Sequence, residues 1–336
     1  MSQDVKRVFG TQQDPGDKRD YLVNSLLKAG KIKPVTNAAQ IDYTAEMSPV
    51  RDQGSLGSCV AFAVCAVKEW QERKERKETA DIVKSYDFSE QWLYYKCKEI
   101  DSWPNQAGTS FRFAMKVLEK EGVPVEQGWD YNPAQVGTPE DWAKHVAKLY
   151  KCGTYWRVSN LAELKLLIAA EGPQPIGIVC FDEFYRPVDG VVPLPANRKK
   201  PRGGHGICVV GYDDTAKLVK FKNSWGKNWG VNGYGYLSYD YYAAYCLDAW
   251  YFADVKIQDN NKDKVDDTPP APKEVKIVVT KVKLFNTMRQ LQQIHIVRNG
   301  KDTMVPIPGR QMATVMSDEM TADVRMRISR GLLQKK

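Results

Sequence analysis

The sequence lacks any long apolar run, and its first ten residues lack the apolar core of a secretory signal. We therefore expect neither a membrane span nor classical secretion. It also lacks Asn-x-Ser/Thr sites, and its seven cysteines form an odd set without the spacing of a disulfide framework. These absences favour free thiols in a reducing compartment, which indicates a cytoplasmic protein.

The chain is large enough for two domains of different character. Its 336 residues are 43% hydrophobic, which allows one large domain and a small one. Most of the formal charge of +8 lies in residues 274–336, which hold twelve Lys and Arg against five Asp and Glu. Because these charges are dispersed, we interpret them as a solvated surface and do not expect nucleic-acid binding.

Helical patterns come first in the chain and strand patterns follow. Apolar spacing and capping residues predict helices that begin near Cys59, Ser89, Phe111, Thr138 and Asn160. Short stretches rich in β-branched and aromatic residues predict strands at 174–180, 205–212, 218–223, 233–239 and 250–257. This order predicts an α+β domain rather than alternating βαβ units, with the site in a cleft between the two halves.

Composition divides the chain into four segments. Residues 1–37 are polar and form a leader or arm, and residues 38–257 form the main domain. Residues 258–273 are charged, Pro-rich and aromatic-free, which is typical of a linker. Residues 274–336 alternate like strands and close with a helix at 318–330, which predicts a small β-rich domain with a C-terminal helix.

One cysteine stands at the start of a predicted helix. The glycine-rich turn at 53–58 leads directly into the helix of Cys59, and Ser58 is a good N-cap. Cys59 then lies in the first turn, where free amides and the helix dipole favour a thiolate. A thiolate is the nucleophilic form of cysteine.

A cysteine nucleophile needs a base, a group that orients this base, and an oxyanion site. Of the three histidines, His145 lies on a polar helix and His295 in a strand of the tail, whereas His205 is flanked by glycines. Asn223 ends the next predicted strand and can orient His205. Gln53 can donate to an oxyanion together with the backbone amide of Cys59.

Three segments resemble the active-site blocks of papain-like cysteine peptidases: residues 49–63, 204–212 and 222–234. The resemblance covers about residues 38–257. It implies a two-lobed papain-like fold, with a helical lobe and an antiparallel β-barrel-like lobe. It also implies a protein or peptide substrate, no cofactor and no metal. The implied catalytic residues are Cys59 as nucleophile, His205 as base and acid, Asn223 as its orienter and Gln53 as oxyanion donor.

The resemblance extends to substrate binding. Gly108 resembles the glycine that binds the substrate backbone, Gly204 precedes the histidine, and Trp225 resembles the tryptophan on the leaving-group side. The segment 89–123 is similar to the bacterial and phage branch of the family.

The chain departs from the family at three points. Leu56 replaces a cysteine of a family disulfide, and Val60 replaces an aromatic residue, which we expect to open the wall beside the nucleophile. We also expect the long inhibitory propeptide of the family to be absent, because only the short leader precedes the main domain. The leader either plugs the cleft or wraps the domain, and both arrangements remain open.

The sequence also allows interpretations other than a peptidase. Cys65, Cys180 and Cys208 are interpreted as packing residues. His205 and Cys208 are a poor metal pair, because on a strand they point to opposite faces and no second pair follows. The alternatives are a virion-associated structural protein with little turnover, docked through residues 274–336 to a phage particle, and a thiol amidase or transglutaminase.

Overall fold

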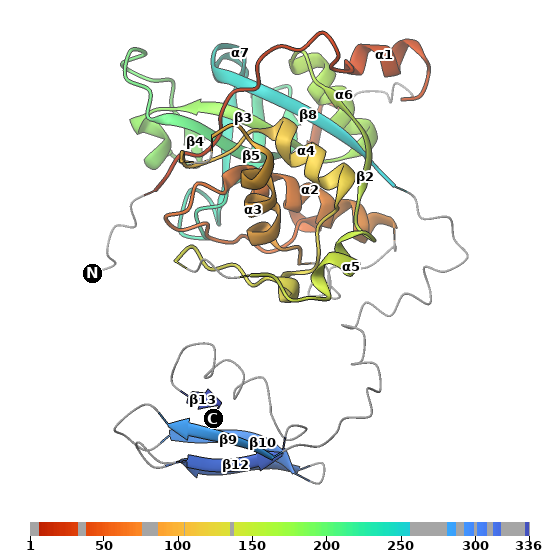
Figure 1. Cartoon of the computed structure of the whole chain (residues 1–336). Coiled ribbons are helices and arrows are strands. Elements are labelled where there is room, and N and C mark those ends of the chain that lie inside the picture. Colours follow the sequence, from red (N-terminus) through yellow and green to blue (C-terminus); the bar gives the residue numbers. More distant parts are fainter. Residues whose placement is uncertain are drawn as a thin grey trace. The chain divides into compact units, whose positions relative to one another are not determined.

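The chain forms two units, Met1–Val265 and Asp266–Lys336, and each is described by itself. The computed structural model (Figure 1) describes residues 7–32, 38–75, 87–103, 105–134 and 138–255 and the backbone of five strands in the second unit. The predicted linker at 258–273 and the predicted helix at 318–330 lie outside the described residues. In the part of the chain that is described, no helix is long and apolar enough to span a bilayer.

The first half of the larger unit is mainly helical. Its α-helices are α1 (Val23–Lys28), α2 (Cys59–Glu75), α3 (Glu90–Ile100), α4 (Phe111–Lys120) and α5 (Ala143–Ala147), with 3-10 turns η1 (Thr44–Glu46) and η3 (Glu126–Gly128). Helices α2, α3 and α4 pack together, as Figure 1 shows. Ser89 caps α3 as predicted, since its hydroxyl accepts from the Trp92 amide at 3.1 Å.

The second half is built on one mainly antiparallel sheet with strand order β2-β8-β3-β5-β6-β7-β4, and β1 pairs with β5. Only β4 runs parallel to its neighbour β7 among these pairs. The strands are β1 (Gln40–Asp42), β2 (Cys152–Arg157), β3 (Gln174–Cys180), β4 (Val191–Val192), β5 (Gly203–Asp213), β6 (Leu218–Lys222), β7 (Tyr234–Ser238) and β8 (Cys246–Asp254). Helices α6 (Leu161–Glu171) and α7 (Tyr239–Tyr245) and the 3-10 turn η4 (Asp182–Tyr185) accompany them.

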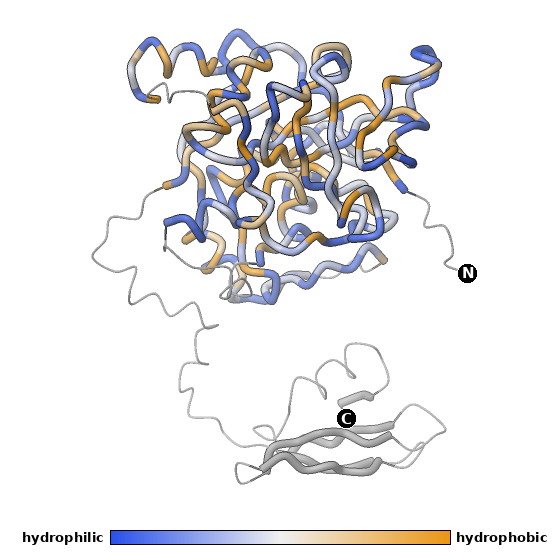
Figure 2. Tube along the Cα trace, turned by 180° about the vertical axis from the view of Figure 1, so that it is seen from behind, coloured by the Kyte–Doolittle hydropathy of each residue, from blue (hydrophilic) through white to orange (hydrophobic). Residues whose placement is uncertain are grey.

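The contact between α2 and β5 brings the two halves together. A Cβ on Gly206 of β5 would lie 3.0 Å from backbone atoms of Cys59 and Val60. Only a glycine allows the strand to approach the first turn of the helix so closely. The buried hydrophobic residues form two clusters, one around α2, α3 and α4 and one on the sheet. In Figure 2 the hydrophobic segments run through the interior, and hydrophilic segments lie on outer loops.

Part of the predicted leader belongs to the sheet core. Val23, Leu26 and Ile32 are buried in the sheet cluster. The Arg157 amide donates to the Tyr21 carbonyl at 2.7 Å. We call residues 21–32 the anchor segment.

Strands β2 and β4 were not predicted, and two helices differ from the prediction. Helix α5 begins at Ala143 rather than near Thr138, because the Glu140 amide donates to the Gly128 carbonyl at 2.9 Å and holds this segment against η3. Helix α7 was not predicted, although Ser238 caps it by accepting from the Tyr241 amide at 3.0 Å. Its tyrosine-rich sequence has the composition of a strand.

The described strands of the second unit form two small antiparallel sheets. One is the β10–β11 pair, and the other has the order β12-β9-β13. The strands are β9 (Lys281–Asn286), β10 (Gln292–Arg298), β11 (Lys301–Ile307), β12 (Met312–Met316) and β13 (Leu333–Lys335). The sequence predicts strands within residues 274–336 but none after the helix at 318–330, where β13 lies.

Candidate active site

Cys59 is the first residue of α2, the most buried helix of the larger unit. The turn before it contains Gly54 at φ +60, and the Phe62 amide donates to the Ser58 carbonyl at 3.2 Å. Ser58 therefore occupies the predicted N-cap position, but its hydroxyl lies 2.6 Å from the Tyr131 hydroxyl. The Tyr131 hydroxyl donates in turn to the Gln53 carbonyl at 2.7 Å, which ties the turn to the loop that follows α4.

His205 on β5 is fixed by Asn223, which directly follows β6. Its Nε2 lies 2.8 Å from Asn223 Oδ1, and this oxygen also accepts from the Ser224 amide at 2.8 Å. Because Oδ1 is an acceptor, Nε2 is the donor, and Nδ1 is the nitrogen left to face Cys59. The rings of Trp225 and Phe184 lie 5.1 and 5.3 Å from the His205 ring and exclude water from this hydrogen bond.

The acidity of Cys59 sets it apart from the other cysteines. Burial opposes its ionisation, but the hydrogen bond and positive charge of His205, with the Thr11 hydroxyl and Gly206, lower the pKa of Cys59 to about 7. Burial instead raises the pKa of Cys208 to about 12 and raises those of Cys65 and Cys180. All seven cysteines are free thiols.

The Gln53 side chain is oriented at both ends. Its Oε1 accepts from the Ser224 hydroxyl at 2.6 Å, and its Nε2 donates to the Leu56 carbonyl at 2.8 Å. The backbone also pairs, since the Gln53 amide donates to the Ser224 carbonyl at 2.9 Å. The segment that carries Gln53 is therefore joined to the one that follows Asn223.

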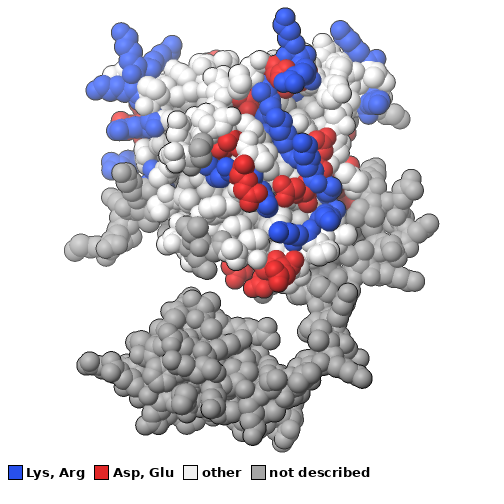
Figure 3. Space-filling view, viewed as in Figure 1, with Lys and Arg blue, Asp and Glu red and all other residues white. Residues whose placement is uncertain are grey.

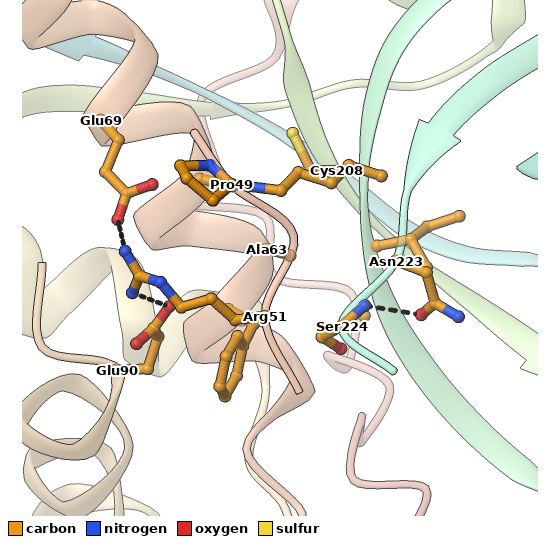
Figure 4. Close-up of a pocket in the computed structure, with 13 residues that line it drawn as sticks. Pro49, Arg51, Ala63, Glu69, Glu90, Cys208, Asn223 and Ser224 are labelled. Atoms are coloured by element: carbon orange, nitrogen blue, oxygen red, sulfur yellow. Dashed lines mark hydrogen bonds and ion pairs between the residues drawn. The ribbon is translucent and has the colours of Figure 1, made fainter. Parts of the chain in front are cut away.

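A buried ion-pair cluster holds the segment before Gln53. Arg51 pairs with Glu69 of α2 at 3.3 Å, with Glu90 of α3 at 2.8 Å, and with Asp87. Figure 4 shows Arg51 between the two helices, at a small cavity that Asn223 also lines. The positive charge and its three partners fix the angle at which the chain enters the turn before Cys59. This cluster could not be predicted from the sequence, because nothing in the spacing of these residues marks them as neighbours.

Two of these carboxylates also belong to a candidate metal site. Among the described residues, Asp87, Glu90 and Glu126 place oxygen atoms within 4.8 Å of one another. Arg51 pairs with two of these three and already supplies a positive charge there. Burial raises the pKa of Glu90 despite this partner.

Residues 7–14 lie along the cleft over Cys59, and we call them the plug segment. The Thr11 amide donates to the Gly204 carbonyl at 2.9 Å on one wall. On the other wall, the Gln12 amide donates to the Thr109 carbonyl at 2.9 Å and the Thr109 amide donates to the Gly10 carbonyl at 2.8 Å. The two walls of the cleft thus hold the plug by backbone hydrogen bonds.

Glycines make this close fit possible. A Cβ on Gly108, whose φ is +91, would lie 1.9 Å from the Gly10 carbonyl oxygen, and one on Gly204 would lie 2.1 Å from that of Thr11. On the plug itself, a Cβ on Gly10 would lie 2.2 Å from the Gly57 carbonyl oxygen. Any side chain at these positions would force the plug and the walls apart.

Side chains of the plug cover the cysteine and its surroundings. Thr11 Oγ1 lies 3.4 Å from Cys59 Sγ. The Val8 carbonyl accepts from Gln53 Nε2 at 3.4 Å. The Phe9 ring lies 5.9 Å from the His205 ring and 5.7 Å from that of Trp225. Cys59 and His205 are both 0% exposed in this arrangement.

The loop that carries Gly108 is held by one lysine. Lys98 Nζ donates to the carbonyls of Trp103 at 2.6 Å, Gln106 at 2.9 Å and Gly108 at 3.0 Å, and pairs with Asp101 at 2.9 Å. Three carbonyls on one ammonium group fix the backbone of this wall. This role of Lys98 could not be predicted from the sequence, because a lysine in a charged helix gives no sign that it binds loop carbonyls.

The structure thus brings Cys59, His205, Asn223 and Gln53 together, with Gly108, Gly204 and Trp225 on the cleft walls. A model of the family described as "Papain family cysteine protease" matches residues 37–249. The chain belongs to the papain family of cysteine proteases. Residues 250–336 lie beyond this match.

The relatives of this papain-family chain come from viruses, bacteria and eukaryotes. An "Uncharacterized peptidase C1-like protein" of Acanthamoeba polyphaga mimivirus is 27% identical over 296 residues, which cover 80% of this chain and 94% of that protein. The "Viral cathepsin" of Lymantria dispar multicapsid nuclear polyhedrosis virus is 29% identical and covers 56% of this chain and 50% of that protein. The crystal structure of xylellain, a cysteine protease from Xylella fastidiosa, has a TM-score of 0.63 at 28% identity and covers 76% of this chain and 99% of that structure.

The predicted papain-like α+β fold is therefore confirmed, and two departures from the family can now be placed. Leu56 is partly buried against the helical cluster, and no disulfide forms because all seven cysteines are free. Val60 is 0% exposed and packs within the helical core, so it forms no open wall of the cleft. The surface that covers the nucleophile is the plug segment instead.

Proposed function

We propose that the protein is a latent cysteine peptidase, which hydrolyses peptide bonds through a thioester on Cys59 and is closed by its plug segment. The observation that carries this proposal is the pair of His205 and Cys59: the pKa of Cys59 is lowered to about 7, and Asn223 fixes the imidazole at 2.8 Å. A thiol that ionises near neutral pH beside an oriented imidazole is suited to nucleophilic catalysis.

In the acylation step, His205 Nδ1 takes the proton of Cys59, and the thiolate attacks the carbonyl carbon of the peptide. Gln53 Nε2 and the backbone amide of Cys59 donate to the oxyanion, and losing one such donor costs about 10²–10³ in rate. The imidazolium then protonates the leaving amine. In deacylation, His205 takes a proton from water, which attacks the thioester and releases the acid and the thiol.

The direction of the plug supports latency without self-cleavage. The bridge between Thr11 and Thr109 is parallel, and the plug runs from Trp225 toward α4. With the leaving group on the Trp225 side, a substrate runs from Gly108 toward Trp225, which is the opposite direction. The plug therefore presents its peptide bonds to Cys59 with their ends reversed, so no leaving amine faces His205.

The test compares three full-length chains with casein as substrate and mass spectrometry as readout. Gly10→Val opens the cleft, because its side chain cannot fit against Gly57. We expect low cleavage by the native chain, clear cleavage by Gly10→Val, and none by Gly10→Val combined with Cys59→Ala. Cleavage that persists without Cys59 would refute the proposal, and an open but inactive chain would point to a structural role.

A further inference from the structure

Charged side chains hold both ends of the plug: Arg7 pairs with Asp52 at one end, and Asp14 binds at the other. Asp14 is 3% exposed, and its carboxylate lies at the N-terminus of α4. One oxygen accepts from the Ser110 hydroxyl, and the other accepts from the Arg112 amide at 3.0 Å. Between these two ends the plug is held mainly through its backbone, and Asp14 is the acidic side chain of the plug that the cleft binds directly.

Helix α4 relies on this carboxylate for its cap. Ser110 occupies the N-cap position, but its side chain makes no capping hydrogen bond to the helix. The free amides and the dipole of this ten-residue helix favour an anion at its first turn. Asp14 of the plug therefore supplies the capping acceptor that the helix lacks. Its removal leaves the Ser110 hydroxyl and the Arg112 amide without this acceptor.

Two arginines flank the position. Arg112 Nη2 pairs with Asp20 at 2.7 Å, and Arg157 Nη2 pairs with Asp248 at 2.8 Å and donates to the Asp14 carbonyl at 3.2 Å. With two guanidinium groups against Asp20 and Asp248, these charges balance once Asp14 has left. The helix terminus and the Ser110 hydroxyl then favour a new carboxylate in its place.

The backbone of Asp14 is recognised as well. Its amide donates to Asp248 Oδ2 at 2.8 Å. Burial raises the pKa of Asp14, while the Ser110 hydroxyl, the Arg112 amide and the two guanidinium groups act to lower it. On the face shown in Figure 3, Lys and Arg are interspersed with Asp and Glu, so this face offers no broad field of one sign. Selectivity for an acidic group would then depend on local contacts.

We propose that Ser110 and the N-terminus of α4, flanked by Arg112 and Arg157, form a subsite for an acidic side chain of a peptide substrate. Thr11 lies at Cys59 and Asp14 follows three residues later, so the subsite accepts Asp or Glu two or three positions before the cleaved bond. This inference rests on the proposed peptidase function. The plug fills the subsite with its own carboxylate while the cleft is closed.

The first experiment measures turnover, with the full-length Gly10→Val chain and peptides that differ only in one residue. We expect kcat/KM to be about tenfold higher for peptides with Asp or Glu at the second or third position before the cleaved bond than for their Asn or Gln counterparts. Ser110→Ala and Arg112→Gln should each remove most of this preference. The matched control is Lys116→Gln, which removes one positive charge from α4 a turn away and should leave the preference unchanged.

The second experiment measures binding and needs no turnover. A labelled peptide with the sequence of residues 7–14 is titrated by anisotropy into the full-length chain carrying Gly10→Val and Cys59→Ala. We expect it to bind about tenfold tighter than the same peptide with Asn in place of its final Asp, and Ser110→Ala to remove the difference.

The two experiments distinguish the proposed subsite from the proposed peptidase function. Equal affinity of the Asp and Asn peptides, or turnover without preference for Asp or Glu, would overturn the subsite. A preference in binding without any turnover would keep the subsite and refute the peptidase.

Discussion

Cys59 and Cys65 lie on the same helix and are both 0% exposed, but their pKa values are shifted in opposite directions. The pKa of Cys59 is lowered to about 7, whereas burial and the negative charges of Glu90 and Glu69 raise the pKa of Cys65 well above its usual range. Burial is common to both thiols and opposes ionisation of each. The difference lies in the groups near each thiol: His205 of β5 for Cys59, and the buried carboxylates of Glu90 on α3 and Glu69 on α2 for Cys65.

This contrast shows that reactivity is placed on α2 by β5 rather than by the helix alone. Gly206 lets β5 approach the first turn of α2, and this approach brings His205 to Cys59. Cys65 lies six residues further along α2, beyond this approach of β5.

The largest effect is expected from removing each thiol in the Gly10→Val chain. Cys59→Ala should lower turnover at least ~10⁴-fold, because it removes the nucleophile. Cys65→Ala should keep turnover within about twofold and lower the free energy of unfolding by about 1 kcal/mol. Peptide hydrolysis and urea denaturation measure the two quantities. A comparable loss of turnover in both variants would show that the helix, and not the thiolate, is what matters.

Removing His205 should make Cys59 resemble Cys65. In the Gly10→Val chain, alkylation of Cys59 by iodoacetamide should rise with pH and level off above about pH 7, because the thiolate reacts. With His205→Ala added, the pKa of Cys59 returns to the ordinary thiol range or higher. Labelling at pH 7 should then fall at least ~15-fold. Mass spectrometry of the peptide that carries Cys59 gives the rate at each pH, and an unchanged midpoint would contradict the assigned role of His205.

Opening the plug should expose one thiol and not the other. Gly10→Val should speed alkylation of Cys59 about tenfold, because the added side chain cannot fit beside Gly57. Cys65 should stay unlabelled, since it lies in the core beneath. Gly16→Val is the matched control, because a Cβ at Gly16 meets nothing within 4 Å. Equal labelling in both variants would mean that the plug does not limit access.

The smallest effect concerns the contact between the plug and the thiol. In the otherwise native chain, Thr11→Val removes a hydroxyl that lowers the pKa of Cys59 and lies 3.4 Å from its sulfur. The midpoint of Cys59 alkylation should rise by less than about one pH unit, which corresponds to one ordinary hydrogen bond. Thr11→Ser, which keeps the hydroxyl, should leave the midpoint in place.

The sequence was sufficient for the parts of the site that depend on short segments. A glycine turn before a helix places Cys59 in the first turn, and consecutive strands place His205 and Asn223 one hairpin apart. Each of these signals lies within about twenty neighbouring residues, where periodicity and capping rules apply.

The contacts that the sequence did not predict join residues far apart in the chain. Arg51 meets Glu90, and Asp14 meets Ser110, each across a long stretch of sequence. Charged residues at such separations have no spacing that distinguishes a buried pair from two solvated side chains. The role of residues 7–14 stayed open for the same reason, because a polar leader has the same composition in a cleft as in solvent.

The anchor segment turns the plug into a tethered ligand. Val23 and Leu26 are held in the sheet core, so only residues 15–20 separate this fixed point from the plug. A ligand on such a short tether is presented at an effective concentration of the order of millimolar. A substrate must therefore outcompete this high local concentration of the plug. A single cut between residues 15 and 20 would remove no residue of the plug and would still activate the protein, because the freed segment would be diluted into solution after it dissociates.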